Sequence, residues 1–93
     1  MKFSGRQVAA ARELLGLSQT ELATATGVAR RTIIRFETGE ADLKPATLQL
    51  IETELQQRGI EFTNGDGAGV RINYAKAAEF ARLSAQSRNN MDR

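Results

Sequence analysis

Three arginines lie close together in the segment ARRTIIRFE, at residues 29–37. On a helix, positions one, four and five after Arg30 fall on the same side as Arg30, so Arg31, Ile34 and Arg35 would share one face. An arginine guanidinium can donate two hydrogen bonds to O6 and N7 of guanine, and an apolar side chain suits the methyl group of thymine. The segment therefore predicts a surface suited to the base edges in the major groove of DNA.

The other side of the same helix is apolar. Ile33 and Phe36 fall there, and we expect them to anchor the helix in a hydrophobic core. Two plainer interpretations stay open. A basic face on an exposed helix can be merely solvated, and Ile34 can belong to the core or to a contact between subunits instead.

Composition limits the other kinds of chemistry. The chain has 93 residues, of which 41% are hydrophobic, as expected for one small globular domain. It contains neither cysteine nor histidine, which argues against disulfides, thiol nucleophiles and the usual zinc sites, so we expect no metal and no cofactor. No stretch approaches the ~20 apolar residues of a membrane span, so we expect a cytoplasmic protein. The net charge is only +2, and the distribution of charge matters more than its total.

The apolar spacing and the stop signals predict four helices in the first part of the chain. They cover residues 4–16, 18–27, 30–38 and 45–59. Ser18 and Glu21 have the spacing of a capping box, and Pro45 suits a first helical turn. Because only a short turn with Gly27 separates the second helix from the third, the two form a helix-turn-helix in the literal sense.

After residue 59 the pattern changes from helical to alternating. The alternating apolar residues are Ile60, Phe62, Val70 and Ile72. They flank the glycine-rich break NGDGAG at 64–69 and predict a β-hairpin. The break is not a phosphate-binding loop, since no lysine follows it and no helix starts on it. Residues 73–87 are rich in helix formers and predict a C-terminal helix, with a frayed tail from about residue 87.

The hairpin has two candidate roles. It can cover the open end of a small core, or it can pair and pack across a two-fold axis. A lone two-stranded hairpin is marginal in water and has unprotected edges, which favours dimerisation. We therefore expect a helix-turn-helix domain over residues 1–58 and a dimerisation arm over residues 59–93. The expected contact residues of the arm are Ile60, Phe62, Val70, Ile72 and Phe80.

The segment RELLGLSQTELATATGVARRTIIRFETGE resembles the lambda-repressor-like helix-turn-helix family, also called the XRE or Cro/CI type. The resemblance covers about residues 5–57 and rests on LGLSQTELA, on Gly27 and Val28 in the turn, and on FETG at the end of the third helix. It implies a mainly α fold, in which a four-helix DNA-binding domain is followed by the hairpin and the C-terminal helix. It also implies that the third helix enters the major groove and that a homodimer binds a pseudo-palindromic operator.

The resemblance further implies roles for individual residues. The base-contacting positions hold Arg30, Arg31 and Arg35, and Ile34 joins them by its place on the same face. The phosphate-contacting positions hold Gln19, Thr38 and Lys44. The plainer alternative for Gln19 is that it is simply a good helix former in a capping turn. Thr38 stands where the family commonly has asparagine. Arg12 and Glu37 match a pair that forms a buried ion pair between the first and third helices.

These observations predict a small bacterial or phage-type transcriptional regulator that binds double-stranded DNA without catalysis. A homodimer would place two such domains on half-sites about one helical turn, ~34 Å, apart. The alternative is an antitoxin or antiactivator that uses the same fold to bind a protein partner through its hairpin and C-terminal helix. An enzyme is disfavoured because no histidine, cysteine or convergent carboxylate pair offers acid-base or nucleophilic chemistry.

Overall fold

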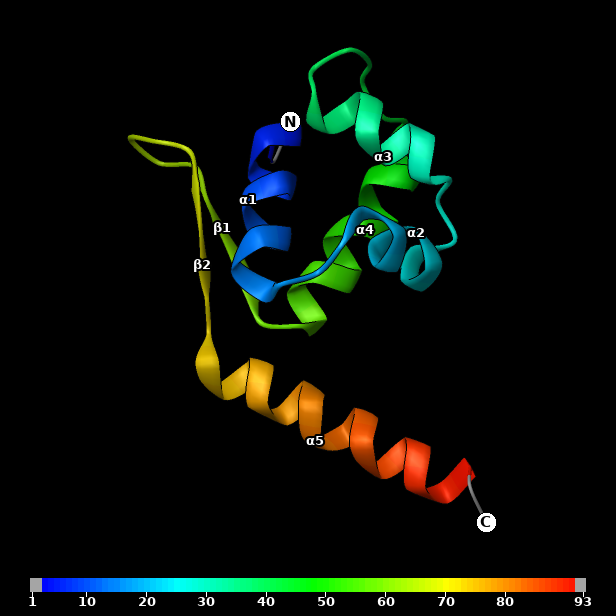
Figure 1. Ribbon diagram of the computed structural model, residues 1–93. Coiled ribbons are helices and arrows are strands. Elements are labelled where there is room, and N and C mark those ends of the chain that lie inside the picture. Colours follow the sequence, from blue (N-terminus) through cyan, green and yellow to red (C-terminus); the bar gives the residue numbers. More distant parts are fainter. Residues whose placement is uncertain (1–2, 92–93) are drawn as a thin grey trace.

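The computed structural model describes the backbone of residues 3–91 and the side chains of residues 3–86 (Figure 1). Within this part of the chain there are five helices and two strands: α1 (Gly5–Leu15), α2 (Gln19–Thr26), α3 (Arg30–Glu37), α4 (Pro45–Gln57), β1 (Ile60–Thr63), β2 (Gly69–Ile72) and α5 (Tyr74–Met91). The expected order of four helices, a hairpin and a C-terminal helix is confirmed.

Local capping decides where the first two helices begin. The Ser4 side chain accepts a hydrogen bond from the backbone N–H of Gln7, while the Gln7 side chain accepts one from the backbone N–H of Ser4. Ser18 and Glu21 make the same reciprocal pair at the start of α2, as their spacing predicted. Gly27 ends α2 with a φ of 77°, a left-handed conformation that favours glycine. The chain can therefore turn sharply from α2 into α3.

The hydrophobic core lies between the first four helices and the hairpin. Its buried residues are Phe3, Val8, Ala11, Leu17, Leu22, Val28, Ile33, Phe36, Ile51, Leu55 and Ile60. At Gly5 the start of α1 packs directly on the end of α3. A Cβ at this position would overlap with the backbone carbonyl of Phe36 and lie 2.9 Å from the Cα of Glu37. The close approach of the two backbones therefore requires glycine.

The hairpin packs on its own helices. Its antiparallel register pairs Ile60 with Ile72 and Phe62 with Val70. The ring of Phe62 stacks on that of Phe3, with 4.3 Å between centroids and 7° between planes, and Val70 and Ile72 are partly buried against the core. Ile60 is only 1% exposed, so its side chain cannot reach a second subunit. This corrects the expected dimer contact at Ile60: the hairpin covers the core of its own chain.

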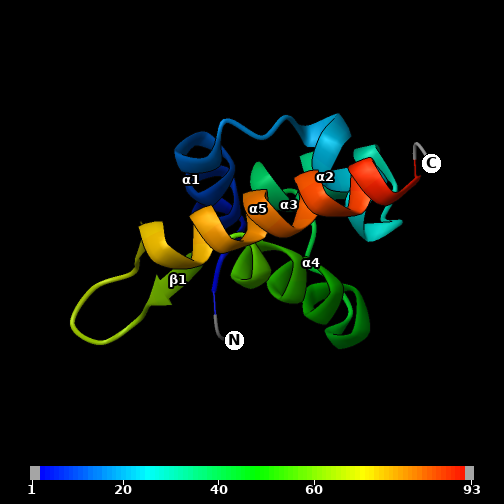
Figure 2. The same ribbon diagram turned by 90° about the horizontal axis from the view of Figure 1, so that it is seen from below.

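α5 begins beside the end of α4 and slants away from the bundle in Figure 1. Figure 2, seen from below, shows that α5 crosses beneath the helical bundle. The junction is tight because Gly59, with a φ of 106°, accepts a 2.6 Å hydrogen bond from the backbone N–H of Asn73. A Cβ at Gly59 would lie 2.8 Å from the Asn73 oxygen and 3.0 Å from the Ala77 nitrogen. The helical backbone continues to Met91, past the expected start of the tail at about residue 87.

A cation covers part of the inner face of α5. The guanidinium carbon of Arg58 lies 4.7 Å from the centroid of the Phe80 ring, within the range of a cation–π contact. Arg58 also pairs with Glu54 at 2.7 Å, one turn earlier in the chain.

Among the described residues, no helix is long and apolar enough to cross a bilayer.

Candidate nucleic-acid interface

α3 is anchored on one side and open on the other. Ile33 is fully buried and Phe36 is 3% exposed, as their spacing predicted, and the turn at Gly27 joins the helix to α2. Because these residues fix the inner face, the side chains on the outer face project away from the core. α3 can therefore present a defined surface to a partner.

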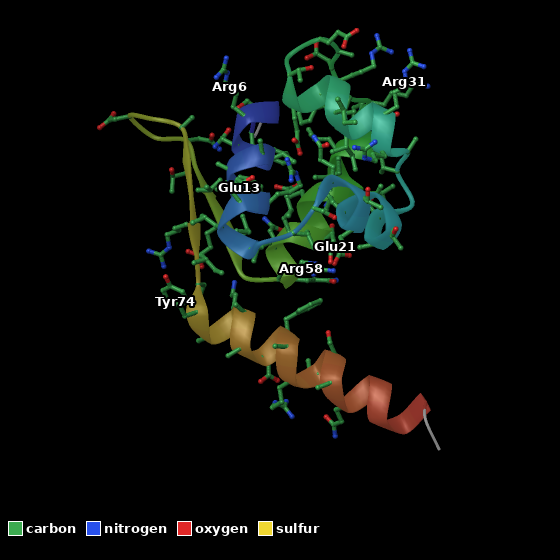
Figure 3. All side chains as sticks on the ribbon, in the orientation of Figure 1. Arg6, Glu13, Glu21, Arg31, Arg58 and Tyr74 are labelled. Atoms are coloured by element: carbon green, nitrogen blue, oxygen red, sulfur yellow. The ribbon has the colours of Figure 1, made fainter. Side chains whose placement is uncertain are left out.

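The arginines of α3 lie on this outer face. Arg30 and Arg31 are exposed and make no ion pair with any described residue, and Figure 3 shows Arg31 standing out from the molecule. Arg35 is also exposed, but its Nε lies 3.5 Å from Oε1 of Glu40. Both partners of this pair are well solvated, so the contact is weak and can be exchanged for another. Ile34 is partly buried and lies at the border between the basic face and the core.

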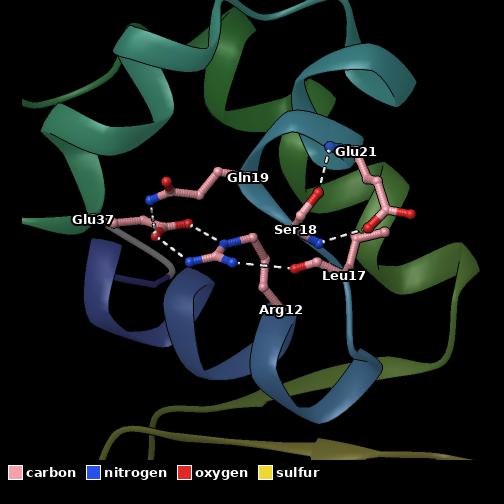
Figure 4. A network of polar contacts seen from close by, with 6 residues as sticks. All are labelled: Arg12, Leu17, Ser18, Gln19, Glu21 and Glu37. Carbon is pink, nitrogen blue, oxygen red and sulfur yellow. Dashed lines mark hydrogen bonds and ion pairs between the residues drawn. The ribbon is translucent and has the colours of Figure 1, made fainter.

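A buried ion pair holds α3 to α1 (Figure 4). The Nε and one terminal nitrogen of Arg12 each donate a 2.7 Å hydrogen bond to the carboxylate of Glu37, and the other terminal nitrogen donates to the backbone oxygen of Leu17 at 3.1 Å. The hydrogen bonds to Glu37 raise the pKa of Arg12 above its ordinary value. The pair is geometrically suited to hold the two helices at a fixed angle.

Gln19 joins the same network. Its side-chain amide donates a 3.0 Å hydrogen bond to Oε1 of Glu37, which links the start of α2 to the end of α3. The expected role of Gln19 was a contact with a DNA phosphate. An amide nitrogen has two hydrogens, and no second bond from this nitrogen to a described residue is present. The structure thus gives Gln19 a positioning contact, and its contact with a phosphate stays a prediction.

The other two expected phosphate contacts flank the loop after α3. Thr38 is exposed, and its hydroxyl donates to the backbone oxygen of Arg35 at 3.2 Å. Lys44 is exposed at the start of α4. Between them, Glu40 and Asp42 are exposed acids, which makes this loop a poor match to the charge of a phosphate backbone.

Gln7 is a positioning residue that the sequence did not reveal. It is 6% exposed, and its side-chain amide donates to the backbone oxygens of Thr63 at 3.2 Å and of Gly69 at 3.0 Å. These two residues face each other at the loop end of the hairpin. The spacing of Ser4 and Gln7 was a visible capping signal, but nothing local pointed to the hairpin.

Within the described residues, no group of three or more histidine, cysteine, aspartate or glutamate side chains could hold a metal ion.

The architecture and the exposed basic helix define a helix-turn-helix domain. Residues 8–61 match the family HTH_3, described as Helix-turn-helix, and because this is more than half of the chain, the protein belongs to that family. The resemblance to the XRE or Cro/CI type is thereby confirmed. No curated protein matches the chain as a relative.

Membership of this family implies DNA binding and the role of a transcriptional regulator. Domains of this kind are typical of regulators without enzymatic activity. The second helix of the motif, here α3, is the element that such domains place in the major groove.

Proposed function

We propose that the protein regulates transcription as a homodimer that binds a pseudo-palindromic operator. One observation carries the proposal of sequence-specific binding: α3 is fixed in the core by Ile33 and Phe36 while Arg30 and Arg31 stand exposed and unpaired among the described residues. A rigid helix with two free guanidinium groups can meet the O6 and N7 atoms of guanine with defined geometry.

The proposed division of labour follows the position of each side chain. Arg30, Arg31 and Arg35 read base edges, with Ile34 at the side of the basic face as an apolar contact. Around them, Gln19, Thr38 and Lys44 are the candidates for hydrogen bonds to phosphates. Such phosphate contacts supply affinity that falls as the salt concentration rises, and they carry no direct sequence information.

For the homodimer, we propose the groove between α4 and α5 as the contact face. The groove has a volume of about 670 Å³ and is lined by Gln56 and Gln57 of α4 and by Lys76, Glu79, Phe80, Leu83 and Ser84 of α5. Leu83 is 50% exposed there, although it is a large apolar side chain. Phe62, Val70 and Ile72 lie mainly against their own core, so α5 is the better candidate within the arm.

Charge favours a second copy of the chain as the occupant of this groove. Lys76 and Glu79 lie about one turn apart on the same wall and carry opposite charges. Glu79 pairs with Arg82 of its own helix at 2.6 Å, but both side chains are more than half exposed, so this pair is weak and can be exchanged. When two copies of α5 pack antiparallel about a two-fold axis, their order is reversed, so Lys76 of each copy can face Glu79 of the other. Phe80 and Leu83 supply the apolar part of the contact.

Selection of binding sites from random DNA tests the proposed recognition. We expect a short consensus with two related half-sites whose centres are about one helical turn apart. Fluorescence anisotropy should then show that the selected site binds on the order of 10³-fold more tightly than a scrambled duplex at the same salt concentration. Equal affinity for both duplexes would contradict sequence-specific regulation.

Sedimentation equilibrium tests the dimer. Leu83→Glu should dissociate it, because the substitution places a charge in the apolar contact. Leu14→Glu is the matched control, since Leu14 is 48% exposed on α1, away from the groove. A wild-type chain that sediments as a monomer would contradict the homodimer, and the groove would then be the candidate site for a protein partner.

A further inference from the structure

We propose that Arg6, in the first turn of α1, is a further contact with the DNA phosphate backbone. It lies beside the C-terminal end of α3, where the chain continues into the following loop. The inference rests on the proposed mode of DNA binding and adds a residue that neither the arginine-rich segment nor the family motif indicates. Four observations carry it: the place of Arg6, its exposure, the charge around it and the rigidity of its support.

The place of Arg6 is set by the residue before it. Gly5 touches the backbone at Phe36 and Glu37, the last two residues of α3. The backbone oxygen of Phe36 in turn accepts a 3.1 Å hydrogen bond from the N–H of Gly39 in the turn that follows. Arg6 is thus held next to the end of α3, although it lies far from α3 in the sequence.

Arg6 is exposed, and it makes no ion pair with any described residue. Figure 3 shows Arg6 and Arg31 standing out at the same end of the molecule, with α3 and its following loop between them. A duplex that lies along the outer face of α3 has phosphates on both sides of its major groove. Arg6, in the first turn of α1, can reach the phosphates on one of these two sides.

The charge of this flank is otherwise poorly suited to DNA. The loop after α3 exposes Glu40 and Asp42, and Glu40 lies 3.5 Å from Arg35 and offsets part of its charge. Lys44 is the cation that the loop itself provides. A guanidinium at Arg6 can therefore supply attraction that the loop lacks, and its planar fork suits the oxygens of a phosphate.

The support of Arg6 is rigid on both sides. Before it, Gly5 is packed on the end of α3. After it, the buried side chain of Gln7 caps α1 through Ser4 and bonds to both strands of the hairpin. The backbone of Arg6 is thus fixed before DNA binds, and only its side chain has to be ordered.

The test is a salt titration of binding by the full chain with the variant Arg6→Gln, using the selected duplex and a scrambled one. Loss of one phosphate contact should lower the slope of log affinity against log salt by about 0.9. It should lower the affinity for both duplexes about five-fold at 0.15 M salt and leave their ratio unchanged. Arg6→Lys keeps the charge and should retain most of the slope.

Arg71→Gln is the control for the change in net charge, because Arg71 lies on β2 and its side chain is 65% exposed. Unlike Arg6, Arg71 forms an ion pair, with Glu61 at 2.6 Å. We expect the control to leave the slope unchanged. If Arg6→Gln keeps the wild-type slope, or lowers affinity only for the selected duplex, Arg6 is not a phosphate contact, although the proposed function stands. If the wild-type chain binds neither duplex, the proposed function fails and the inference fails with it.

Discussion

Gln19 and Arg12 donate hydrogen bonds to the same atom, Oε1 of Glu37, at 3.0 and 2.7 Å. The three residues belong to α2, α1 and α3, so one carboxylate joins the three helices that frame the recognition surface. The angle between α2 and α3 determines how α3 enters a groove. The network therefore connects the stability of the fold with the orientation of the basic face.

Glu37→Gln should destabilise the protein. The side chains of Glu37 and Arg12 are only 5% and 12% exposed, and loss of one partner leaves the other charge buried without its counterion. We expect a cost of ~3 kcal/mol in the free energy of unfolding, measured by urea denaturation. In a separate double-mutant cycle, the double variant Arg12→Met, Glu37→Leu should be less destabilised than the sum of the single variants Arg12→Met and Glu37→Leu. Strict additivity would show that the pair has no coupling energy.

Gln19→Ala should weaken binding to selected and scrambled duplexes by the same factor. Gln19 is positioned by Glu37 and retains one donor for a phosphate, so its loss removes no base contact. Loss of its bond to the carboxylate should also cost ~1–2 kcal/mol of stability. Anisotropy on both duplexes and urea denaturation measure the two effects. A loss of affinity confined to the selected duplex would instead assign Gln19 to base recognition.

Arg31→Ala should act on specificity. We expect it to cost ~1–3 kcal/mol on the selected site and to relax the preference at one base position. Repeating the site selection with the variant reveals which position is relaxed. Arg71→Ala is the control for removal of an exposed arginine and should reproduce the wild-type consensus. An unchanged consensus for Arg31→Ala would remove this residue from the reading surface.

Gly5→Ala should destabilise the chain by ~1–3 kcal/mol, because a methyl group has no room between α1 and the end of α3. Gly65→Ala is the matched control: it lies in the hairpin loop, and a Cβ there meets no atom within 4 Å. Thermal denaturation should show a lower Tm for the first variant and little change for the second. Similar Tm values for both would contradict the close approach of the two helices.

The capping box of α2 should make stability depend on pH in acid. The backbone of Ser18 donates to the Glu21 carboxylate at 2.9 Å and holds the pKa of Glu21 below its ordinary value of 4.5. Because the pKa is lower in the folded chain, the stabilisation is present above about pH 4.5 and is lost as the pH falls through the folded value. Glu21→Gln should flatten the stability profile in that acidic range, measured by urea denaturation.

The sequence predicted those parts of the fold that depend on neighbouring residues. Ser18 and Glu21 marked the start of α2, Gly27 its end and Pro45 the start of α4, because caps and stops act within one helical turn. The inner face of α3 followed from its period. The existence and approximate position of the two strands followed from the change to alternation.

What the sequence did not reveal depends on contacts between distant segments. Gln7 meets Thr63 and Gly69 only in the folded chain, so no local pattern indicated that α1 holds the hairpin. The same holds for the packing of Gly5 on α3. Ile60 alternates with polar residues whether it faces its own core or another subunit, so the pattern could not decide between the two.

The junction at Gly59 and Asn73 sets the direction in which α5 leaves the domain, since a side chain at Gly59 would collide with the start of that helix. In a dimer joined through α5, this one joint would fix how far apart the two α3 helices lie. The spacing between half-sites would then be encoded at Gly59, far in the sequence from every residue that reads a base. Regulators that recognise the same half-site at a different spacing could be obtained by changing this joint while the arginines of α3 stay as they are.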